Sequence, residues 1–185
     1  YDELTYDFKH TPFASLKAMR KNTIYLNGFS KSYAMTGFRL GYACGPREII
    51  AAMTKIHQYT MLRASIISQM GALEALKNGF KSLEEMKKEY KRRRDFIVDG
   101  LNNLGLECFK PQGAFYVFPS IKNTGLNSLE FAEKLLKQQK VAVVPGTAFG
   151  PSGKGHVRIS YAASFDNIKE ALSRIAKFLK SCRKY

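Results

Sequence analysis

Residues 27–42 read Asn27-Gly28-Phe29-Ser30-Lys31-Ser32-Tyr33-Ala34-Met35-Thr36-Gly37-Phe38-Arg39-Leu40-Gly41-Tyr42. Runs of β-branched, aromatic and other apolar residues at 22–26 and 38–43 predict two short, largely buried strands around the lysine. Gly45-Pro46 ends the second strand and opens a helix, with Pro46 at the first helical position. A second helix ends at Asn78-Gly79. This alternation of strands and helices indicates an α/β architecture. The apolar stripes expected on the two helices are Ile49, Ile50, Met53 and Ile56, and Ile66, Ile67, Met70, Leu73 and Leu76.

The chain from about residue 80 onward has a different pattern, which predicts an α+β subdomain. Its first part places one apolar face along a long helix that closes near Gly105. The elements expected after it are strands at 106–110 and 114–118 joined by the turn Pro111-Gln112-Gly113, a helix with a capping box at Asn127 to Glu130, strands at 141–144 and 156–161, and a C-terminal helix. We therefore predict two domains, 1–79 and 80–185.

The composition is that of an ordinary globular protein. Hydrophobic residues make up 45% and charged residues 24% of the 185 residues, which argues against disorder. No apolar run approaches the roughly 18 residues of a membrane span, and the opening Tyr1-Asp2-Glu3-Leu4 is not a signal peptide. The three cysteines, Cys44, Cys108 and Cys182, are far apart and odd in number. Neither a disulfide framework nor a zinc site follows, and we expect a cytoplasmic protein without a membrane partner.

The net charge of +15 is strongly positive, and one cluster of basic residues contributes to it. Eight basic residues and three acidic ones lie between Lys77 and Arg94. Such a face could neutralise nucleic-acid phosphates. However, the acids lie at helical spacing from the bases and no aromatic stacking platform interleaves with them, so we interpret the cluster as a solvated helix face and expect no nucleic-acid partner. The basic residues are Lys77, Lys81, Lys87, Lys88, Lys91, Arg92, Arg93 and Arg94.

Other motifs of catalysis and phosphate binding fail on inspection. The stretch Gly146 to Gly155 is rich in glycine, but Ala148 and Gly155 stand where a phosphate loop needs Gly and Ser or Thr. We predict a flexible loop between two strands there. The sequence contains no His-x-x-x-His, Cys-x-x-Cys or nucleophile elbow. Metal-dependent hydrolysis and serine or cysteine acyl transfer therefore have no support, and no metal is expected.

Lys31 lies at the end of an apolar strand between small hydroxyl residues, with Arg39 eight positions further on. A lysine that is taken out of water gives up its proton more readily, and its amine can then form a Schiff base. Arg39, among glycines and aromatic residues, suits a planar fork held against a phosphate. The alternative is a lysine that reaches solvent and an arginine in a structural ion pair. Spacing alone favours this simpler alternative.

The segment from Ser30 to Tyr42 closely resembles the lysine signature of class I and II aminotransferases, the fold-type-I pyridoxal 5′-phosphate (PLP) enzymes. Further stretches resemble motifs of this family in the correct order, and together the match covers essentially the whole chain. These stretches are Tyr1-Asp2-Glu3-Leu4-Thr5-Tyr6, Pro111-Gln112-Gly113-Ala114-Phe115-Tyr116-Val117-Phe118-Pro119, Val144-Pro145-Gly146-Thr147-Ala148-Phe149-Gly150 and His156-Val157-Arg158-Ile159-Ser160-Tyr161-Ala162. The resemblance implies that 1–79 is the C-terminal part of the large PLP-binding domain and that 80–185 is the small domain.

The resemblance also implies a role for each candidate site residue. Lys31 would hold PLP as a Schiff base and then move a proton between the substrate α-carbon and the cofactor. Arg39 would bind the cofactor phosphate, and Tyr1 would donate a hydrogen bond to the ring 3′-oxygen, unless it is a frayed terminus. Arg158 would bind the substrate α-carboxylate through a bidentate pair, unless it is a plain strand arginine. Ser30 would touch the phosphate or only flank the lysine.

The activity implied is exchange of an amino group between an amino acid and a 2-oxo acid in a homodimer. The stretch 57–65 lies where dimer contacts of the family approach the neighbouring active site, and it suggests the aspartate or aromatic branch. One alternative is another fold-type-I activity, such as a carbon-sulfur lyase. A second alternative is a non-catalytic interaction module that uses the basic helix.

Two departures from the family pattern bear on this interpretation. Gly28 stands where many relatives carry a hydroxyl residue as a phosphate ligand. The aspartate that pairs with the pyridine nitrogen and most of the phosphate cradle would precede Tyr1. We therefore expect the chain as given to be the C-terminal half of an aminotransferase and to be inactive by itself.

Overall fold

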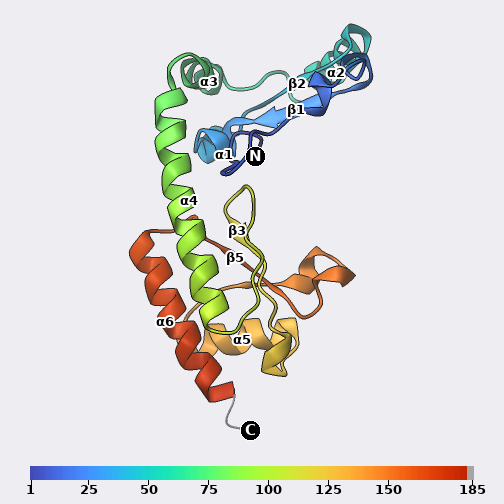
Figure 1. The fold of residues 1–185 in the computed structure, drawn as a ribbon. Helices are drawn as coiled ribbons and strands as arrows, with labels where there is room; N and C mark the ends of the chain where they lie inside the picture. The colour runs from blue at the N-terminus through green and yellow to red at the C-terminus, as the bar shows by residue number, and fades with distance from the viewer. Residues whose placement is uncertain (183–185) are drawn as a thin grey trace. The chain divides into compact units, whose positions relative to one another are not determined.

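The computed structural model describes residues 1–182 (Figure 1). By internal contacts the chain divides into two compact units, Tyr1–Lys87 and Lys88–Tyr185, and the long helix α4 (Phe80–Asn103) contributes to both. Helices combine with short sheets, which confirms the predicted α/β class. None of the helices within 1–182 has the length and apolar character that a membrane span requires.

The N-terminal unit is built on a two-stranded antiparallel sheet of β1 (Tyr25–Gly28) and β2 (Gly41–Cys44). Both strands begin three residues later than predicted, because 3₁₀ turns occupy Arg20–Asn22 and Thr36–Phe38. The prediction that the two strands are largely buried is wrong, since none of their residues is buried in this chain. The last pair of the ladder is Gly28 with Gly41. The chain between these two glycines, which contains the lysine motif, therefore leaves and re-enters the sheet at the same end.

Three helices accompany this sheet. They are α1 (Phe29–Ser32), α2 (Arg47–Thr60) and α3 (Ile66–Asn78). Pro46 caps α2 and is not its first helical residue, one position from the prediction. A small core of Phe29, Met35 and Ala72 holds α1 to α3. The apolar stripes predicted for α2 and α3 stay largely exposed in this chain, because a two-stranded sheet offers little surface to cover them.

The C-terminal unit contains a three-stranded antiparallel sheet with the strand order β3-β5-β4. Its elements are β3 (Tyr116–Val117), β4 (Val144–Pro145), β5 (Val157–Ser160), α5 (Ser128–Gln139) and α6 (Phe165–Cys182). The predicted capping box is confirmed: the Asn127 side chain accepts from the Glu130 amide, and the Glu130 carboxylate accepts from the Asn127 amide.

The core of this unit forms where α4, α5 and α6 pack together. Figure 1 shows α6 beside the C-terminal half of α4. Gly100 permits this approach, because a Cβ atom there would come within 2.6 Å of the Leu172 side chain. The rings of Phe131 and Phe178 meet edge to face at 5.3 Å between α5 and α6. These contacts create a rigid support for the sheet.

The strand predicted at 106–110 is not formed. Instead, the side chain of Asn102 pairs with both backbone groups of Cys108: Asn102 Oδ1 accepts from the Cys108 amide at 2.9 Å, and Asn102 Nδ2 donates to its carbonyl oxygen at 3.1 Å. One side-chain amide thus replaces the hydrogen bonds that a neighbouring strand would supply. The apolar pattern at 106–110 correctly predicted burial, since Leu106 and Cys108 lie in the core. The predicted pairing of this segment with a neighbouring strand is wrong.

Several side chains of the basic cluster, which begins with Lys77 on α3 and continues along α4, form ion pairs. Glu89 accepts from both Arg92 and Arg93, and Lys87 lies 3.6 Å from Glu84. The interpretation of the cluster as a solvated face is wrong for Arg94, whose side chain is 0% exposed. Sequence counting grouped this arginine with its neighbours, although it lies on the inward face of the helix.

Candidate active site

Lys31 lies in α1, a single helical turn that follows β1 directly. Phe29, two residues before Lys31, is 4% exposed and anchors this turn. The Phe29 amide donates to the Leu40 carbonyl oxygen at 3.2 Å, and the Phe29 ring lies 5.6 Å from the Tyr42 ring. Because the turn is fixed at its first residue, Lys31 is half-buried at a defined end of the sheet. This is the strand-end position that the sequence predicted.

Arg39 comes from the neighbouring turn, just before β2. Its backbone is left-handed, with φ of 51°, which is uncommon for a residue with a side chain. Nη1 of Arg39 donates to the Thr36 carbonyl oxygen at 2.9 Å, and the residue is exposed. Since Gly28 pairs with Gly41, Arg39 and Lys31 lie at the same end of the hairpin. Unusual backbone conformations of this kind cluster at functional sites, where surrounding structure holds them in place.

Two serines flank the lysine, and one of them is unsatisfied. Ser32 is 3% exposed, and its hydroxyl has no hydrogen-bond partner within residues 1–182. Ser30 is half-buried. A primary amine, a guanidinium and a buried hydroxyl with spare hydrogen-bonding capacity form a donor set that fits a phosphorylated aldehyde.

The segment that begins with Tyr1 is tied to β1 through its neighbour Asp2. The Asp2 carboxylate accepts hydrogen bonds from the Tyr25 hydroxyl and from Asn27 Nδ2, the latter at 2.9 Å. Asn27 Oδ1 in turn accepts from the Gly28 amide at 2.7 Å. Sequence reasoning missed this network because its members are more than twenty positions apart. Tyr1 itself is 46% exposed, and its carbonyl oxygen accepts from the Leu4 amide.

The network lowers the pKa of the Asp2 carboxyl and raises the pKa of the Tyr25 hydroxyl. Burial alone would raise the pKa of the Asp2 carboxyl, but the hydrogen bonds from Tyr25 and Asn27 outweigh it and lower that pKa below its ordinary value. Burial and the adjacent Asp2 carboxylate together raise the pKa of the Tyr25 hydroxyl well above its ordinary value. At neutral pH the pair is therefore a carboxylate and a neutral phenol, which suits a charge-assisted hydrogen bond.

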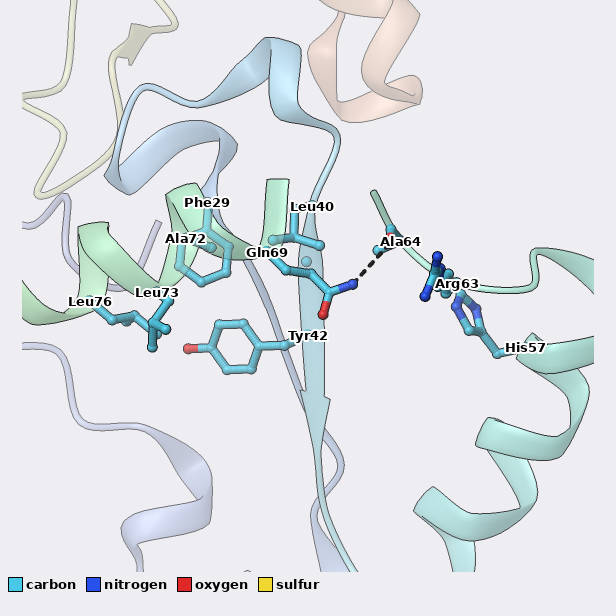
Figure 2. A pocket seen from close by; sticks show the side chains of 11 residues that line it. Phe29, Leu40, Tyr42, His57, Arg63, Ala64, Gln69, Ala72, Leu73 and Leu76 are labelled. Atoms are coloured by element: carbon cyan, nitrogen blue, oxygen red, sulfur yellow. Dashed lines mark hydrogen bonds between the residues drawn. The ribbon is translucent and has the colours of Figure 1, made fainter. Parts of the chain in front are cut away.

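A hollow of about 540 Å³ lies between β2 and α3 in the same unit (Figure 2). Its walls are mainly apolar and include Phe29, Leu40 and Leu73. Figure 2 shows the Tyr42 hydroxyl directed toward Leu73. Lys31 is not among the residues that line it. The hollow and the candidate cofactor residues are therefore separate features of the unit.

Arg158 lies on β5 in the C-terminal unit and is half-buried. Its guanidinium carbon lies 4.5 Å from the centre of the Tyr116 ring and 4.4 Å from the centre of the Phe149 ring. Both distances fall within the range of cation–π contacts. The arrangement differs from a plain strand arginine that extends into solvent.

The loop that carries Phe149 is folded tightly, and it connects two strands, β4 and β5, as predicted. It consists of two 3₁₀ turns, Gly146–Phe149 and Pro151–Gly153. A Cβ atom at Gly153 would lie 1.9 Å from the Gly146 carbonyl oxygen, so only glycines allow the two turns to approach this closely. Glycine serves compact packing in these two turns.

Comparison with known proteins places this architecture in a family. The family model described as aminotransferase class I and II matches residues 1–175. The chain belongs to this family. Its YugH relative from Bacillus subtilis (strain 168) is 54% identical over 97% of this chain and 46% of the relative. The aspartate aminotransferase of Pyrococcus abyssi (strain GE5 / Orsay) is 48% identical over 97% of this chain and 47% of the relative.

Solved structures agree with the family assignment. The crystal structure of an aromatic aminotransferase from Pyrococcus horikoshii OT3 matches with a TM-score of 0.95 and 46% identity, covering 99% of this chain and 50% of that one. The fold-type-I aminotransferase architecture inferred from the sequence is therefore confirmed. The chain spans about half the length of the relatives that it matches.

Proposed function

We propose that the whole protein to which this chain belongs is a PLP-dependent aminotransferase. It would exchange an amino group between an L-amino acid of the aspartate or aromatic type and a 2-oxo acid. The observation that carries the proposal is the shared position of Lys31 and Arg39 at one end of the hairpin, fixed by the Gly28–Gly41 pair. Relatives named as aspartate and aromatic aminotransferases support the substrate class. None of these names favours a carbon-sulfur lyase or a non-catalytic module.

The residues present fit the cofactor, and four of them would hold it. The Lys31 amine would bind the aldehyde carbon, Arg39 the phosphate through its planar fork, Ser30 the phosphate edge, and Tyr1 the ring oxygen. When bound, PLP supplies an electron sink for the negative charge that develops at the substrate α-carbon. Lys31 would then hold and move the proton at that carbon, as a general acid and base.

Gly28 leaves room for a side chain. A Cβ atom there would lie 3.5 Å from the Leu40 carbonyl oxygen, an ordinary contact, whereas one at Gly41 would lie 2.9 Å from the Asn27 carbonyl oxygen. Steric hindrance therefore does not explain why this chain lacks a hydroxyl residue at position 28. In this proposal Arg39 carries a larger share of phosphate binding than in relatives with a hydroxyl residue there.

Arg158 would bind the substrate α-carboxylate, and its replacement by lysine tests that role. Lysine cannot reproduce a bidentate fork, so Arg158→Lys is expected to raise the KM of both the amino acid and the 2-oxo acid about ten- to a hundredfold. Steady-state kinetics of the whole protein measures this. Arg174→Lys, at a half-buried arginine of α6 paired with Glu170, is the matched control and should change neither constant. Unchanged KM values for Arg158→Lys would remove this residue from the site.

We further propose a homodimer in which the stretch 57–65 is part of the interface. Tyr59 is 92% exposed and Leu62 is 80% exposed, and clusters of exposed apolar side chains commonly mark protein contacts. Leu62 has a left-handed backbone with φ of 61°, a conformation that aspartate tolerates well. This makes Leu62 a suitable position for a disruptive charge.

Leu62→Asp is expected to raise the dimer dissociation constant at least about tenfold, because the interface would bury an unpaired carboxylate. Sedimentation equilibrium of the whole protein measures it. Leu129→Asp is the control, since Leu129 is 55% exposed in the first turn of α5, where an acidic residue is favourable. A monomeric wild type, or a dimer unaffected by Leu62→Asp, would contradict the proposed interface.

Two finer assignments belong to the same proposal. We assign 1–79 to the large domain and 80–185 to the small domain, supported by the start of α4 at Phe80 directly after Gly79. We place the protein in the cytoplasm, supported by the free thiols of Cys44, Cys108 and Cys182. Limited proteolysis near residue 80 and fractionation of cells that express the protein test these two assignments.

A further inference from the structure

We infer that Tyr116 and Phe149 are positioning residues that hold the guanidinium of Arg158 in the plane from which it binds a carboxylate. The inference rests on the proposed role of Arg158 and adds two residues to it. Neither ring would need to touch the reacting atoms. Their contribution would be to fix the cation that binds the substrate carboxylate.

The two rings reach Arg158 from the two sides of its strand. The sheet order is β3-β5-β4, so β5 lies between the other two strands. Tyr116 lies on β3, where it pairs with Ser160, and Phe149 lies in the turn that follows β4, where Val144 pairs with Arg158. With ring centres at 4.5 Å and 4.4 Å, both rings are close enough to cover the faces of the guanidinium.

Each of the two rings is itself held by a second aromatic ring. The Phe115 ring lies 4.7 Å from that of Tyr116. The Phe118 ring meets Phe149 at 6.1 Å nearly edge to face, and it stacks on His156 at 5.4 Å with only 7° between the planes. Offset and edge-to-face pairs of this kind hold rings in defined orientations. The clamp around Arg158 is therefore part of a larger aromatic layer over the sheet.

The backbone beneath the clamp is also fixed. The Gly146 amide donates to the His156 carbonyl oxygen at 2.9 Å, which ties the loop carrying Phe149 to the start of β5. On the other side, the Tyr161 hydroxyl donates to the Ala114 carbonyl oxygen at 2.9 Å, and Tyr161 is 0% exposed. Both rings thus come from segments that are anchored to the strand that carries the arginine.

A clamp of this form changes how the arginine can bind. An arginine side chain has many rotamers, and ordering it on binding lowers affinity. Rings on its faces favour one plane in advance and leave the N–H donors at the edge, where they match a planar carboxylate. A lysine ammonium is also attracted to a ring face, but it is not planar, so the rings cannot set a plane of two N–H donors for it.

The test combines binding and nuclear magnetic resonance on the whole protein, without cofactor. The probe is 2-oxoglutarate, followed through the Nε–Hε signal of Arg158. Tyr116→Leu and Phe149→Leu are each expected to weaken binding about two- to fivefold, the equivalent of one exposed cation–π contact. Tyr116→Phe and Phe149→Tyr keep a ring and should bind as the wild type does. Phe109→Leu, at an 80% exposed ring, is the control.

The ring-current shift of the Arg158 signal provides a second readout that general stability does not move. The signal should lie upfield in the wild type and in the ring-keeping variants, and it should return toward the position of exposed arginines in the leucine variants. Wild-type affinity and shift in both leucine variants, with binding lost in Arg158→Ala, would overturn the clamp and leave the proposed function intact. Equal binding by wild type and Arg158→Ala would overturn the role of Arg158 and the inference with it.

Discussion

Replacing Lys31 with alanine is expected to reduce transamination by the whole protein at least about a thousandfold. The Lys31 amine is the one group at this end of the hairpin that can both bind an aldehyde and accept the α-proton of the substrate. The neighbouring Arg39 and Ser30 remain in Lys31→Ala, so phosphate binding should survive in part. The variant should therefore retain measurable affinity for PLP while its turnover is lost.

Chemical mapping checks the same assignment without relying on activity. After incubation with PLP and reduction with borohydride, the adduct should be found on the peptide that contains Lys31. Lys21→Ala is the control, because Lys21 lies exposed in the 3₁₀ turn just before β1 and should not affect the adduct. An adduct on another lysine, or full turnover in Lys31→Ala, would disprove the catalytic role.

The residues of the lysine motif could be predicted because their chemistry is local. Lys31, Ser30 and Arg39 lie within ten positions of the sequence. They also lie in the segment between Gly28 and Gly41, and the pairing of these two glycines places all three residues at one end of the hairpin. The hydrogen bonds of Asp2 with Tyr25 and Asn27 could not be predicted in this way. Nothing in the local sequence around Asp2 indicates which distant strand its carboxylate will meet.

The clamp around Arg158 shows a similar limit in the other unit. The resemblance to the family pointed to Arg158, but no sequence spacing places Tyr116 and Phe149 against it. Their positions depend on the strand order β3-β5-β4 and on the close approach of Gly146 to Gly153. The glycines that suggested a flexible loop are the residues that make the loop compact.

The strand predicted at 106–110 is absent because a side chain, and not a neighbouring strand, forms hydrogen bonds with the backbone there. Alternating apolar residues correctly indicated that Leu106 and Cys108 are buried. The period of apolar residues indicates which face is buried, but it does not indicate which group forms hydrogen bonds with the backbone N–H and C=O. Asn102 forms these hydrogen bonds here from the end of the preceding helix.

Arg94 was mispredicted although the sequence contains a signal for its burial. The apolar face of α4 includes Leu83, Tyr90, Ile97 and Leu101, and position 94 falls between Tyr90 and Ile97 at helical spacing. A charged residue on an apolar stripe needs a partner inside the protein. Counting charges along the chain concealed this, whereas the helical projection would have separated Arg94 from Arg92 and Arg93.

The structure supplies the partners that a buried arginine requires. Nε of Arg94 donates to the Asp95 carboxylate at 2.9 Å, and Nη1 donates to the Pro111 carbonyl oxygen at 3.0 Å. Lys110 also lies 2.9 Å from Asp95. Arg94 therefore ties α4 to the turn that leads toward Tyr116, and its side chain fills space in the core.

Arg94→Ala is expected to lower the free energy of unfolding of the chain by about 2–4 kcal/mol, through a cavity, an unpaired Pro111 carbonyl and a lost ion pair. Urea unfolding followed by circular dichroism measures this, since the chain contains no tryptophan. Arg92→Ala is the matched control two positions away. Arg92 is 59% exposed, so its loss should cost no more than about 1 kcal/mol. Equal effects of the two variants would show that burial of Arg94 contributes nothing to stability.

The difference in unfolding free energy between wild type and Arg94→Ala should depend on pH. This dependence separates the contribution of the Arg94–Asp95 ion pair from that of side-chain packing. Burial alone would raise the pKa of the Asp95 carboxyl, but hydrogen bonds from Lys110 and Arg94 hold it below its ordinary value. A carboxyl whose folded pKa is lowered stabilises the protein above its unfolded pKa, and this contribution is lost as the pH falls through the folded pKa. The difference in unfolding free energy between wild type and Arg94→Ala should therefore narrow below about pH 4. Arg94→Met fills the cavity without the charge, so its difference from wild type should be smaller at pH 7 and should narrow over the same range. A difference between wild type and Arg94→Ala that stays constant down to pH 2 would mean that Arg94 acts by packing alone.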